Sequence, residues 1–299
     1  MVDGVSDPLH EVVARPEVDE PVLVLGLDGW IDAGFAANTA IGHLRDVIDT
    51  ELVATWDTDV LVDHRSRRPA MHLVEGVNTG LTWPAIELRH GQDPDGRDVL
   101  LLVGAEPDVR WRAFSADVAR LAVELGVRLA VGFGAYPAPV PHTRQSRLAT
   151  TATSPELAAQ AGQIRSTLDV PSGAMAAIER ACADVDVPAT GLWAQVPHYV
   201  SAMPYPDAAA SLVDGLAALG GLRLDATPLR DAARLLRVRL DGLVADNAEH
   251  QAMVTQLEAA IDEEIAADPA VPFAGQVPSG DELAAEVERF LRDVGRDDS

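Results

Sequence analysis

Lysine is absent from this sequence of 299 residues, so arginine supplies all 23 of its basic residues. Chemistry that depends on an internal lysine is therefore excluded, including a Schiff base and the lysine of a phosphate-binding P-loop. Basic residues are also scarce beside the 47 acidic ones, and the formal net charge is −24. This surplus repels phosphate backbones and anionic lipid, so neither nucleic acid nor a membrane is an expected partner.

Cysteine occurs once, at Cys182, so the chain has no internal disulfide and no cysteine-based zinc cluster. We interpret this residue as a small buried hydrophobe and expect a reducing, cytoplasmic location. The eight histidines lack the spacing of metal ligands, and neither a metal ion nor a cofactor is predicted. No stretch is long and apolar enough to cross a bilayer, and we expect the acidic residues 1–20 to be neither a signal peptide nor an anchor.

Three catalytic signatures are missing from the sequence as well. It contains no Gly-x-Ser-x-Gly elbow, no His-Glu-x-x-His motif and no Gly-x-Gly-x-x-Gly after the first predicted strand. Gly132 and Gly134 follow a later strand as in a dinucleotide loop, but the prolines after them prevent the helix N-terminus that such a loop needs. The sequence therefore assigns no catalytic residue.

What the sequence does contain is an alternation of apolar strands with helices. Residues 22–27 form an all-apolar run bounded by glycine, which is typical of a strand buried on both faces, and a small-residue crossover helix follows. The other predicted strands are residues 51–56, 99–103, 127–133 and 189–196, with 71–74 and 85–88 as a weaker candidate hairpin. The pattern predicts an α/β fold with a mostly parallel sheet flanked by helices.

Beyond residue 220 the pattern becomes purely helical. Apolar residues at helical intervals predict a helical hairpin over residues 225–267. Prolines then mark a linker, and a capping-box spacing from Ser279 predicts a last helix. We expect an N-terminal segment (residues 1–20), an α/β core (21–224) and the helical hairpin (225–267). A linker with a final helix that packs on the core (268–292) and a disordered tail (293–299) should follow.

Two loops stand out by their composition. Residues 132–144 contain three prolines and two glycines, which predicts a stiff, shaped loop rather than a continued strand. Residues 63–69 carry three arginines, and two interpretations stay open for them. They form either a solvated loop or a lid that brings guanidinium groups to an acidic ligand or a partner subunit.

Loops after four predicted parallel strands carry the polar residues with chemical potential. Because ligands gather at the carboxyl ends of strands in open α/β sheets, we expect these side chains to share a pocket there. The candidate pocket consists of Trp30, Asp32, Glu106, Asp108, Tyr136, His142, Arg144, His198 and Tyr199.

Each of these residues also has a structural interpretation. Asp32 is placed to cap a helix, and Glu106 or Asp108 could form ion pairs with the arginines that follow them. His142 either satisfies backbone groups in its proline-bracketed loop or works beside Arg144, which could hold a carboxylate or a phosphate. In a catalytic arrangement a histidine would transfer a proton, and the carboxylate of Asp32 or Glu106 would orient that histidine.

Taken together, four motifs in these loops resemble the proteasome assembly chaperone two family, and in particular its actinobacterial branch, which is sometimes labelled as related to ATP-grasp enzymes. The motifs are GWIDAG at residues 29–34, EPDVRW at 106–111, VPHTR at 140–144, and VPHY at 196–199 followed by PYP at 204–206. The resemblance covers roughly residues 20–292. One departure is Gln145, where the family pattern has proline.

The resemblance implies a three-layer α/β fold akin to nucleoside phosphorylases, a homo-oligomer with a trimer as one candidate, and, from eukaryotic relatives, proteasome subunits as partners. ATP-grasp enzymes usually hold nucleotide phosphates with lysine, which this chain lacks. Because the catalytic signatures are missing and the family precedent is chaperoning, we favour an assembly-chaperone-like or scaffold protein without demonstrated catalysis. The alternative is a small-molecule-binding enzyme of the hydrolase, phosphorylase or nucleotide-dependent type, with its pocket at the carboxyl edge of the sheet.

Overall fold

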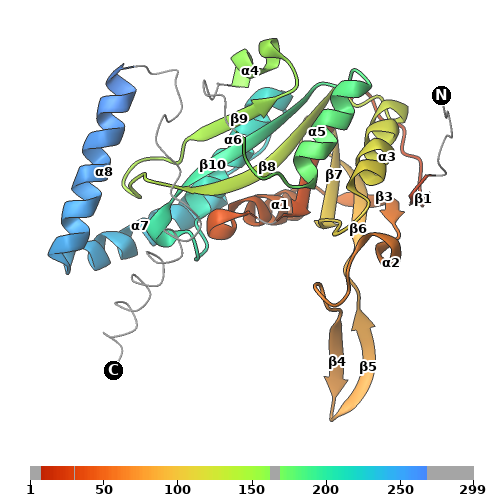
Figure 1. The fold of residues 1–299 in the computed structure, drawn as a ribbon, viewed down its shortest axis with the longest axis horizontal. Coiled ribbons are helices and arrows are strands. Elements are labelled where there is room, and N and C mark those ends of the chain that lie inside the picture. The colour runs from red at the N-terminus through yellow and green to blue at the C-terminus, as the bar shows by residue number, and fades with distance from the viewer. Residues whose placement is uncertain (1–7, 30, 162–168, 268–299) are drawn as a thin grey trace. The chain divides into compact units, whose positions relative to one another are not determined.

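The computed structural model describes residues 8–29, 31–161 and 169–267 (Figure 1). The helices are η1 (Ala33–Phe35), α1 (Ala36–Val47), α2 (Thr58–Leu61), α3 (Trp111–Glu124), α4 (Pro155–Ala161), α5 (Ala174–Asp184), η2 (His198–Val200), α6 (Pro206–Gly220), α7 (Thr227–Ala245) and α8 (Ala248–Ala267). The strands are β1 (His10–Val12), β2 (Val22–Asp28), β3 (Thr50–Trp56), β4 (Ala70–Val74), β5 (Val77–Thr82), β6 (Ile86–Gln92), β7 (Asp98–Ala105), β8 (Leu129–Ala138), β9 (Leu148–Ala152) and β10 (Ala189–Pro197).

The predicted α/β fold is confirmed, with a large sheet flanked by helices and a helical pair after it. The strand order of the sheet is β1-β3-β6-β7-β2-β8-β10-β9, so the apolar run at residues 22–27 is a central strand as predicted. β2 pairs in parallel with β7 and with β8, whereas β6, β3 and β1 are added through antiparallel pairs. The sheet is therefore mixed, with its parallel part around β2.

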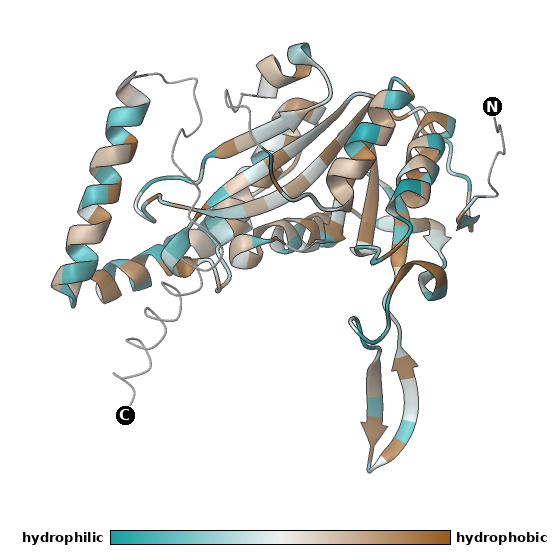
Figure 2. Cartoon of the chain, viewed as in Figure 1, coloured by the Kyte–Doolittle hydropathy of each residue, from teal (hydrophilic) through white to brown (hydrophobic). Residues whose placement is uncertain are grey.

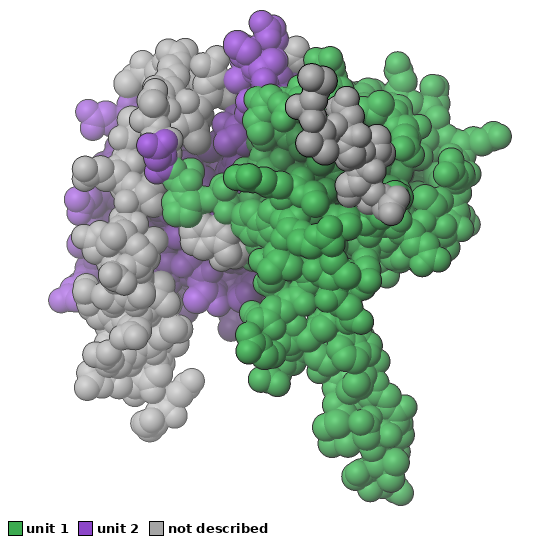
Figure 3. Space-filling view, turned by 45° about the vertical axis from the view of Figure 1, so that its right-hand side comes forward, with its two compact units in different colours: residues 1–30, 48–132, 170–190 green, residues 31–47, 133–169, 191–299 purple. Residues whose placement is uncertain are grey.

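The chain folds into two compact units (Figure 3). Unit 1 comprises residues 1–30, 48–132 and 170–190, and unit 2 comprises residues 31–47, 133–169 and 191–299. Strands β8 and β10 each contribute residues to both units. Each unit is described below by itself.

Unit 1 is built on a hydrophobic cluster between its strands and the helices α3 and α5. Leu23 and Leu25 of β2 contact this cluster, and Phe114 of α3 fills it without any exposed surface. Cys182 of α5 is fully buried in the same cluster, in agreement with its interpretation as a small core residue. Burial raises the pKa of its thiol to about 11, so the sulfur stays protonated and unreactive at neutral pH.

A separate two-stranded ribbon of β4 and β5 projects from unit 1 (Figures 1 and 3). The predicted pairing of residues 71–74 with 85–88 is wrong, because β4 pairs with β5 and residues 86–92 form β6 of the main sheet. Glu75 and Gly76 have φ angles of 50° and 83°, which close a tight two-residue turn of the kind that joins adjacent strands. The turn therefore lies earlier than the sequence interpretation placed it.

Unit 2 contains α1 packed on α6, α6 packed on α7, and the consecutive helical pair α7 and α8, which contact each other. This pair is the predicted helical hairpin of residues 225–267. The prediction that a loop begins at residue 132 is wrong, because β8 continues to Ala138. Proline fits an extended strand, and a Cβ at Gly134 would lie 2.5 Å from the ring of Trp193, so glycine here admits the close approach of that ring.

Parts of the predicted organisation lie outside the described residues, namely the linker and last helix of residues 268–292 and the tail of residues 293–299. Within the predicted N-terminal segment, β1 adds to the sheet beside β3. Among the described helices, none combines the length and the apolar character needed to cross a membrane.

Candidate functional site

His142 lies at the centre of the best-connected group of candidate residues. The hydroxyl of Tyr199 lies 2.8 Å from the backbone nitrogen of His142 and 2.7 Å from its Nδ1. On the other side of the ring, Nε2 lies 3.2 Å from Oδ1 of Asp241 in α7. Both nitrogens of the imidazole are therefore engaged by groups of unit 2.

The hydrogen-bond pattern fixes how this group is protonated. The Tyr199 hydroxyl accepts the backbone N–H of His142 and donates its own hydrogen to Nδ1, so Nε2 carries the ring hydrogen and donates it to Asp241. His142 is 4% exposed, and this burial lowers its pKa although the Asp241 carboxylate opposes the effect. The imidazole is thus neutral at neutral pH.

Arg144, two residues on, is bound by carboxylates of α8. Its Nε and Nη2 lie 3.0 and 2.7 Å from the two oxygens of Asp262, and its Nη1 lies 3.1 Å from Glu258. Thr143 adds a hydrogen bond of 2.5 Å to the same Glu258. The bidentate geometry predicted for an anionic ligand is occupied by Asp262, and the loop is tied to α8 by it.

Asp32 caps the helix that follows it. Its two carboxylate oxygens accept the backbone N–H groups of Ala37 and Asn38 at 2.8 and 3.0 Å, which satisfies donors at the start of α1. Burial raises the pKa of this carboxyl, and the two amide hydrogen bonds oppose that shift. Gly34, two residues on, has a φ of 63° and its backbone exchanges hydrogen bonds with Ser201 and Tyr205.

His198 and Tyr136 are held by partners of their own. The buried His198 ring lies 5.3 Å from the Tyr199 ring, edge to face, and its Nδ1 is 3.4 Å from the carbonyl oxygen of Ala138. The hydroxyl of Tyr136 accepts a hydrogen bond of 3.0 Å from the amide of Gln195. Burial raises the pKa of Tyr136, so it remains a neutral phenol.

Glu106 and Asp108 belong to unit 1 and are engaged there. Glu106 is buried and accepts the N–H of Ala174 at 2.5 Å, at the start of α5, and burial raises its pKa. Asp108 accepts the N–H of Asp63 at 2.8 Å and forms an ion pair of 3.5 Å with Arg67. Its partner is thus an arginine of the loop at residues 63–69 rather than the expected Arg110 or Arg112.

The nine candidates therefore fall into distinct places. His142, His198 and Tyr199 form one buried cluster in unit 2, while Asp32, Tyr136 and Arg144 lie in the same unit with separate partners. Glu106 and Asp108 lie in unit 1, and Trp30 lies outside the described residues. The common pocket of all nine stays a prediction.

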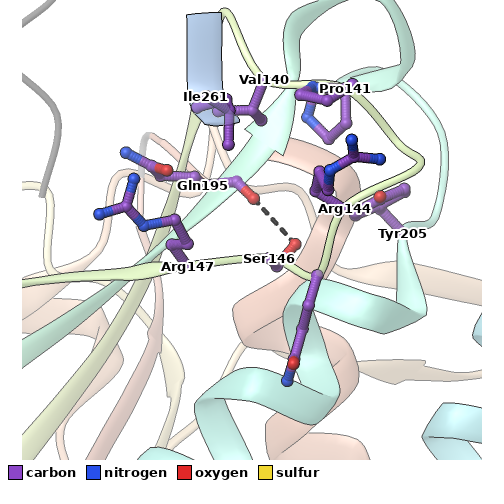
Figure 4. Close-up of a pocket in the computed structure, with 10 residues that line it drawn as sticks. Val140, Pro141, Arg144, Ser146, Arg147, Gln195, Tyr205 and Ile261 are labelled. Carbon is purple, nitrogen blue, oxygen red and sulfur yellow. Dashed lines mark hydrogen bonds between the residues drawn. The ribbon is translucent and has the colours of Figure 1, made fainter. Parts of the chain in front are cut away.

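Unit 2 contains two cavities beside this cluster. The smaller one, drawn in Figure 4, has a volume of about 10 Å³, and its wall includes Arg144, Ser146, Gln195 and Tyr205. It has room for about one water molecule, which excludes an organic ligand. The larger cavity has a volume of about 300 Å³ and lies between residues 142–145, the first turns of α6 and the helix α7.

Several residues that contact His142 and its loop were not predicted from the sequence. Asp241, Glu258 and Asp262 lie 99 to 118 positions from their partners in the loop, and no local pattern encodes such contacts. A usable signal existed for α7, where Arg230, Arg234 and Arg237 recur at intervals of four and three. Among the described residues, no group of three or more histidine, cysteine, aspartate or glutamate side chains is arranged to hold a metal ion.

The PAC2 family model matches residues 26–244 of the chain. This chain belongs to the PAC2 family. A solved structure of a protein of unknown function from Corynebacterium glutamicum is 32% identical, with a TM-score of 0.81, and the match covers 87% of this chain and 99% of that one. A search of curated proteins gave no significant match.

Two further relatives carry informative descriptions. A proteasome-assembly chaperone homologue of Mycobacterium tuberculosis is 32% identical over 78% of this chain and 99% of its own, with a TM-score of 0.73. A PAC2 family protein from Streptomyces avermitilis is 35% identical over 78% of this chain and 99% of its own, with a TM-score of 0.71. The resemblance to the actinobacterial branch of the family is thereby confirmed.

Proposed function

We propose that this chain is an assembly-chaperone-like or scaffold protein of the cytoplasm, which acts by binding protein subunits rather than by catalysis. Membership of the PAC2 family supports this function, because a relative of 32% identity is described as a proteasome-assembly chaperone homologue. Proteasome subunits are therefore the first partners to test.

The observation that carries the proposal is the projecting ribbon of β4 and β5. Met71, Leu73 and Val74 on one strand, with Val77 and Leu81 on the other, are each between 43% and 63% exposed. Both strands are brown over part of their length in Figure 2, which marks their apolar residues. Such a concentration of exposed apolar side chains is typical of a surface that binds another protein.

The arrangement of these side chains strengthens the argument. Met71 faces Leu81 across the ribbon and Val74 faces Val77. Side chains alternate along β4, where Met71 and Val74 are three residues apart and so lie on opposite faces. A register shift between His72 and Leu73 inserts one extra residue in β5, so the paired Leu81 and Val77 follow them, and apolar groups are exposed on both faces. Glu75 is the sole charged residue among residues 70–83 in a chain of which 23% is charged. An isolated two-stranded ribbon is marginally stable in water, so a partner that covers it stabilises it as well.

The internal bonding of the candidate residues is also consistent with a binding protein. His142 is held by Tyr199 and Asp241, and Arg144 by two carboxylates of α8. These contacts attach the loop of residues 139–147 to the helical pair. We interpret them as the scaffold that keeps α7 and α8 in place.

The test is co-elution of the purified chain with purified α-type and β-type proteasome subunits of the same organism. The substitution Leu73→Asp places a charge in the exposed ribbon, whereas Val123→Asp makes a similar change on the exposed face of α3, where Val123 is 51% exposed. We expect the first variant to weaken the complex by about tenfold or more and the second to bind like the wild type. Failure of every subunit to bind, or equal behaviour of the two variants, contradicts the proposal.

We further propose that the chain forms a homo-oligomer, with a trimer as one candidate. On α7 the side chains of Leu235 and Val238 are each 71% exposed, and their spacing of three residues places them on one helix face. A second copy of this chain is the occupant we assign to this face. Light scattering should give a mass above that of one 31.7 kDa chain, and Leu235→Asp should lower it. The mass of a single chain for the wild-type protein contradicts this assignment.

A second candidate function is small-molecule binding in unit 2, in line with an enzyme of the hydrolase, phosphorylase or nucleotide-dependent type. The cavity of about 300 Å³ favours it, since His142 and Arg144 both contribute to its wall. That volume is at the lower limit of ligand sites in proteins. A crystal soaked with nucleotides and phosphate that leaves this cavity without density speaks against this second candidate.

A further inference from the structure

The cavity of about 300 Å³ in unit 2 differs in charge from the rest of the molecule. Four arginines contribute to its wall, namely Arg144, Arg230, Arg234 and Arg237, against the single carboxylate of Asp207. In the whole chain acidic residues outnumber basic ones by 47 to 23. A cluster of guanidinium groups around one cavity in an acidic protein is a feature that attracts anions.

Three of the four arginines are already paired with carboxylates. Arg144 binds Asp262 and Glu258, Arg230 lies 2.5 Å from Asp214, and Arg234 is paired with Asp231. These carboxylates balance the positive charges of the three arginines and use part of their donors.

Arg237 is the exception. Its guanidinium has no hydrogen-bond or ion-pair partner within the described ranges of the chain, although it lies within electrostatic reach of His142 and Asp207. Burial raises the pKa of Asp207, and the positive charge of Arg237 opposes that effect. Its planar set of N–H donors is therefore free to hold an oxyanion in bidentate fashion.

The remainder of the wall is apolar. Leu236 and Leu240 of α7 and Ala210 of α6 contribute aliphatic surface, and Tyr205 contributes a ring that is almost fully buried. A ligand that fills this cavity needs an apolar part in addition to its charge.

We propose that this cavity binds a small organic anion, whose carboxylate or phosphate is held by Arg237 and whose apolar body packs on Leu236, Leu240 and Tyr205. This proposal rests on the second candidate function, small-molecule binding in unit 2, and is independent of the apolar ribbon in unit 1. It identifies Arg237, rather than the sequence candidate Arg144, as the residue that recognises the charge.

The test is a calorimetric titration of the full chain with four probes: phenyl phosphate, benzoate, inorganic phosphate and neutral phenol. The variant Arg237→Gln removes the charge at the cavity, and Arg239→Gln removes the same charge from α7 at a position that does not contribute to the cavity wall. Neither arginine has an internal partner among the residues described, so both variants should keep the melting temperature of the wild type.

We expect saturable binding of phenyl phosphate or benzoate, weakened about tenfold or more by Arg237→Gln and unchanged by Arg239→Gln. The stronger of these two probes identifies the head group as phosphate or carboxylate. The proposal is overturned if neither probe binds at about 1 mM, or if both variants weaken binding equally. It is also overturned if inorganic phosphate or phenol binds as tightly as the organic anions. Equal binding of inorganic phosphate would show that the apolar body contributes nothing, and equal binding of phenol would show that the charge contributes nothing.

Discussion

At the scale of single residues, the hydroxyl of Tyr199 forms two hydrogen bonds with His142. It accepts the backbone N–H and donates to the ring nitrogen Nδ1, and both groups are buried. Removing the hydroxyl leaves two buried polar atoms without a partner, which is more costly than the loss of one exposed hydrogen bond.

We therefore expect Tyr199→Phe to lower the free energy of unfolding by about 1–3 kcal/mol, measured by urea denaturation. Tyr205→Phe is the matched control, because no hydrogen-bond partner of the Tyr205 hydroxyl occurs in the described part of the chain. The control should stay within about 0.5 kcal/mol of the wild type. Equal losses from the two substitutions would show that the Tyr199 hydroxyl has no special role in stability.

His142 makes the stability of the protein dependent on pH. Burial lowers its pKa in the folded state below the ordinary value of 6.5, so the unfolded chain binds the proton more readily. The stability that the neutral ring contributes is complete above pH 6.5 and declines as the pH falls below that value. The wild type should therefore lose more stability than His142→Asn between about pH 7.5 and pH 5. Parallel pH profiles for the two proteins would contradict this assignment.

The sequence predicted part of this cluster. His142, His198 and Tyr199 were candidates because they follow predicted strands, and the structure brings their rings together. Asp241 could not be predicted, since its contact with His142 joins residues 99 positions apart. Local spacing carries no information about such a pair.

At the scale of elements, the entry into α1 depends on Gly34. This residue has a φ of 63°, and a Cβ at its position would lie 2.7 Å from the Cβ of Tyr205. Both the backbone conformation and the contact therefore disfavour any other residue. Gly42 lies in the middle of the same helix with open space around it.

The two glycines make a matched pair for alanine substitution. Gly34→Ala should lower the free energy of unfolding by more than about 1 kcal/mol, because the conformation is strained and the contact must give way. Gly42→Ala should raise it by about 0.5–1 kcal/mol, since alanine favours the helix. Thermal denaturation of both variants measures this difference, and a shift of the same sign in both would refute it.

The elements themselves were largely predictable where their patterns are local. The apolar run at residues 22–27 and the helical periodicity of residues 225–267 each indicated the observed element. The ribbon was misassigned because the turn at Glu75 and Gly76 requires positive φ at a non-glycine residue. Strand β8 was predicted too short because Pro137 can belong to an extended strand when its missing N–H is not needed.

At the scale of the whole molecule, the division into two compact units was not predicted. The alternation of strands and helices up to residue 220 is continuous, and it favoured a single core over residues 21–224. The units gather segments that are far apart in the sequence, such as residues 31–47 with residues 133–169. Hydrophobic periodicity in the sequence identifies helices and strands, but it does not indicate which of them pack into the same compact unit. The predicted boundary at residue 224 stays a prediction.

The central claim is that this PAC2 family chain promotes the assembly of other subunits through its apolar ribbon. The measurement that tests it most directly is the time course of ring formation by purified proteasome α subunits, followed by native electrophoresis with and without the chain. We expect faster assembly with the wild type and with Val123→Asp, and no acceleration with Leu73→Asp. Identical time courses with and without saturating wild-type chain would contradict it.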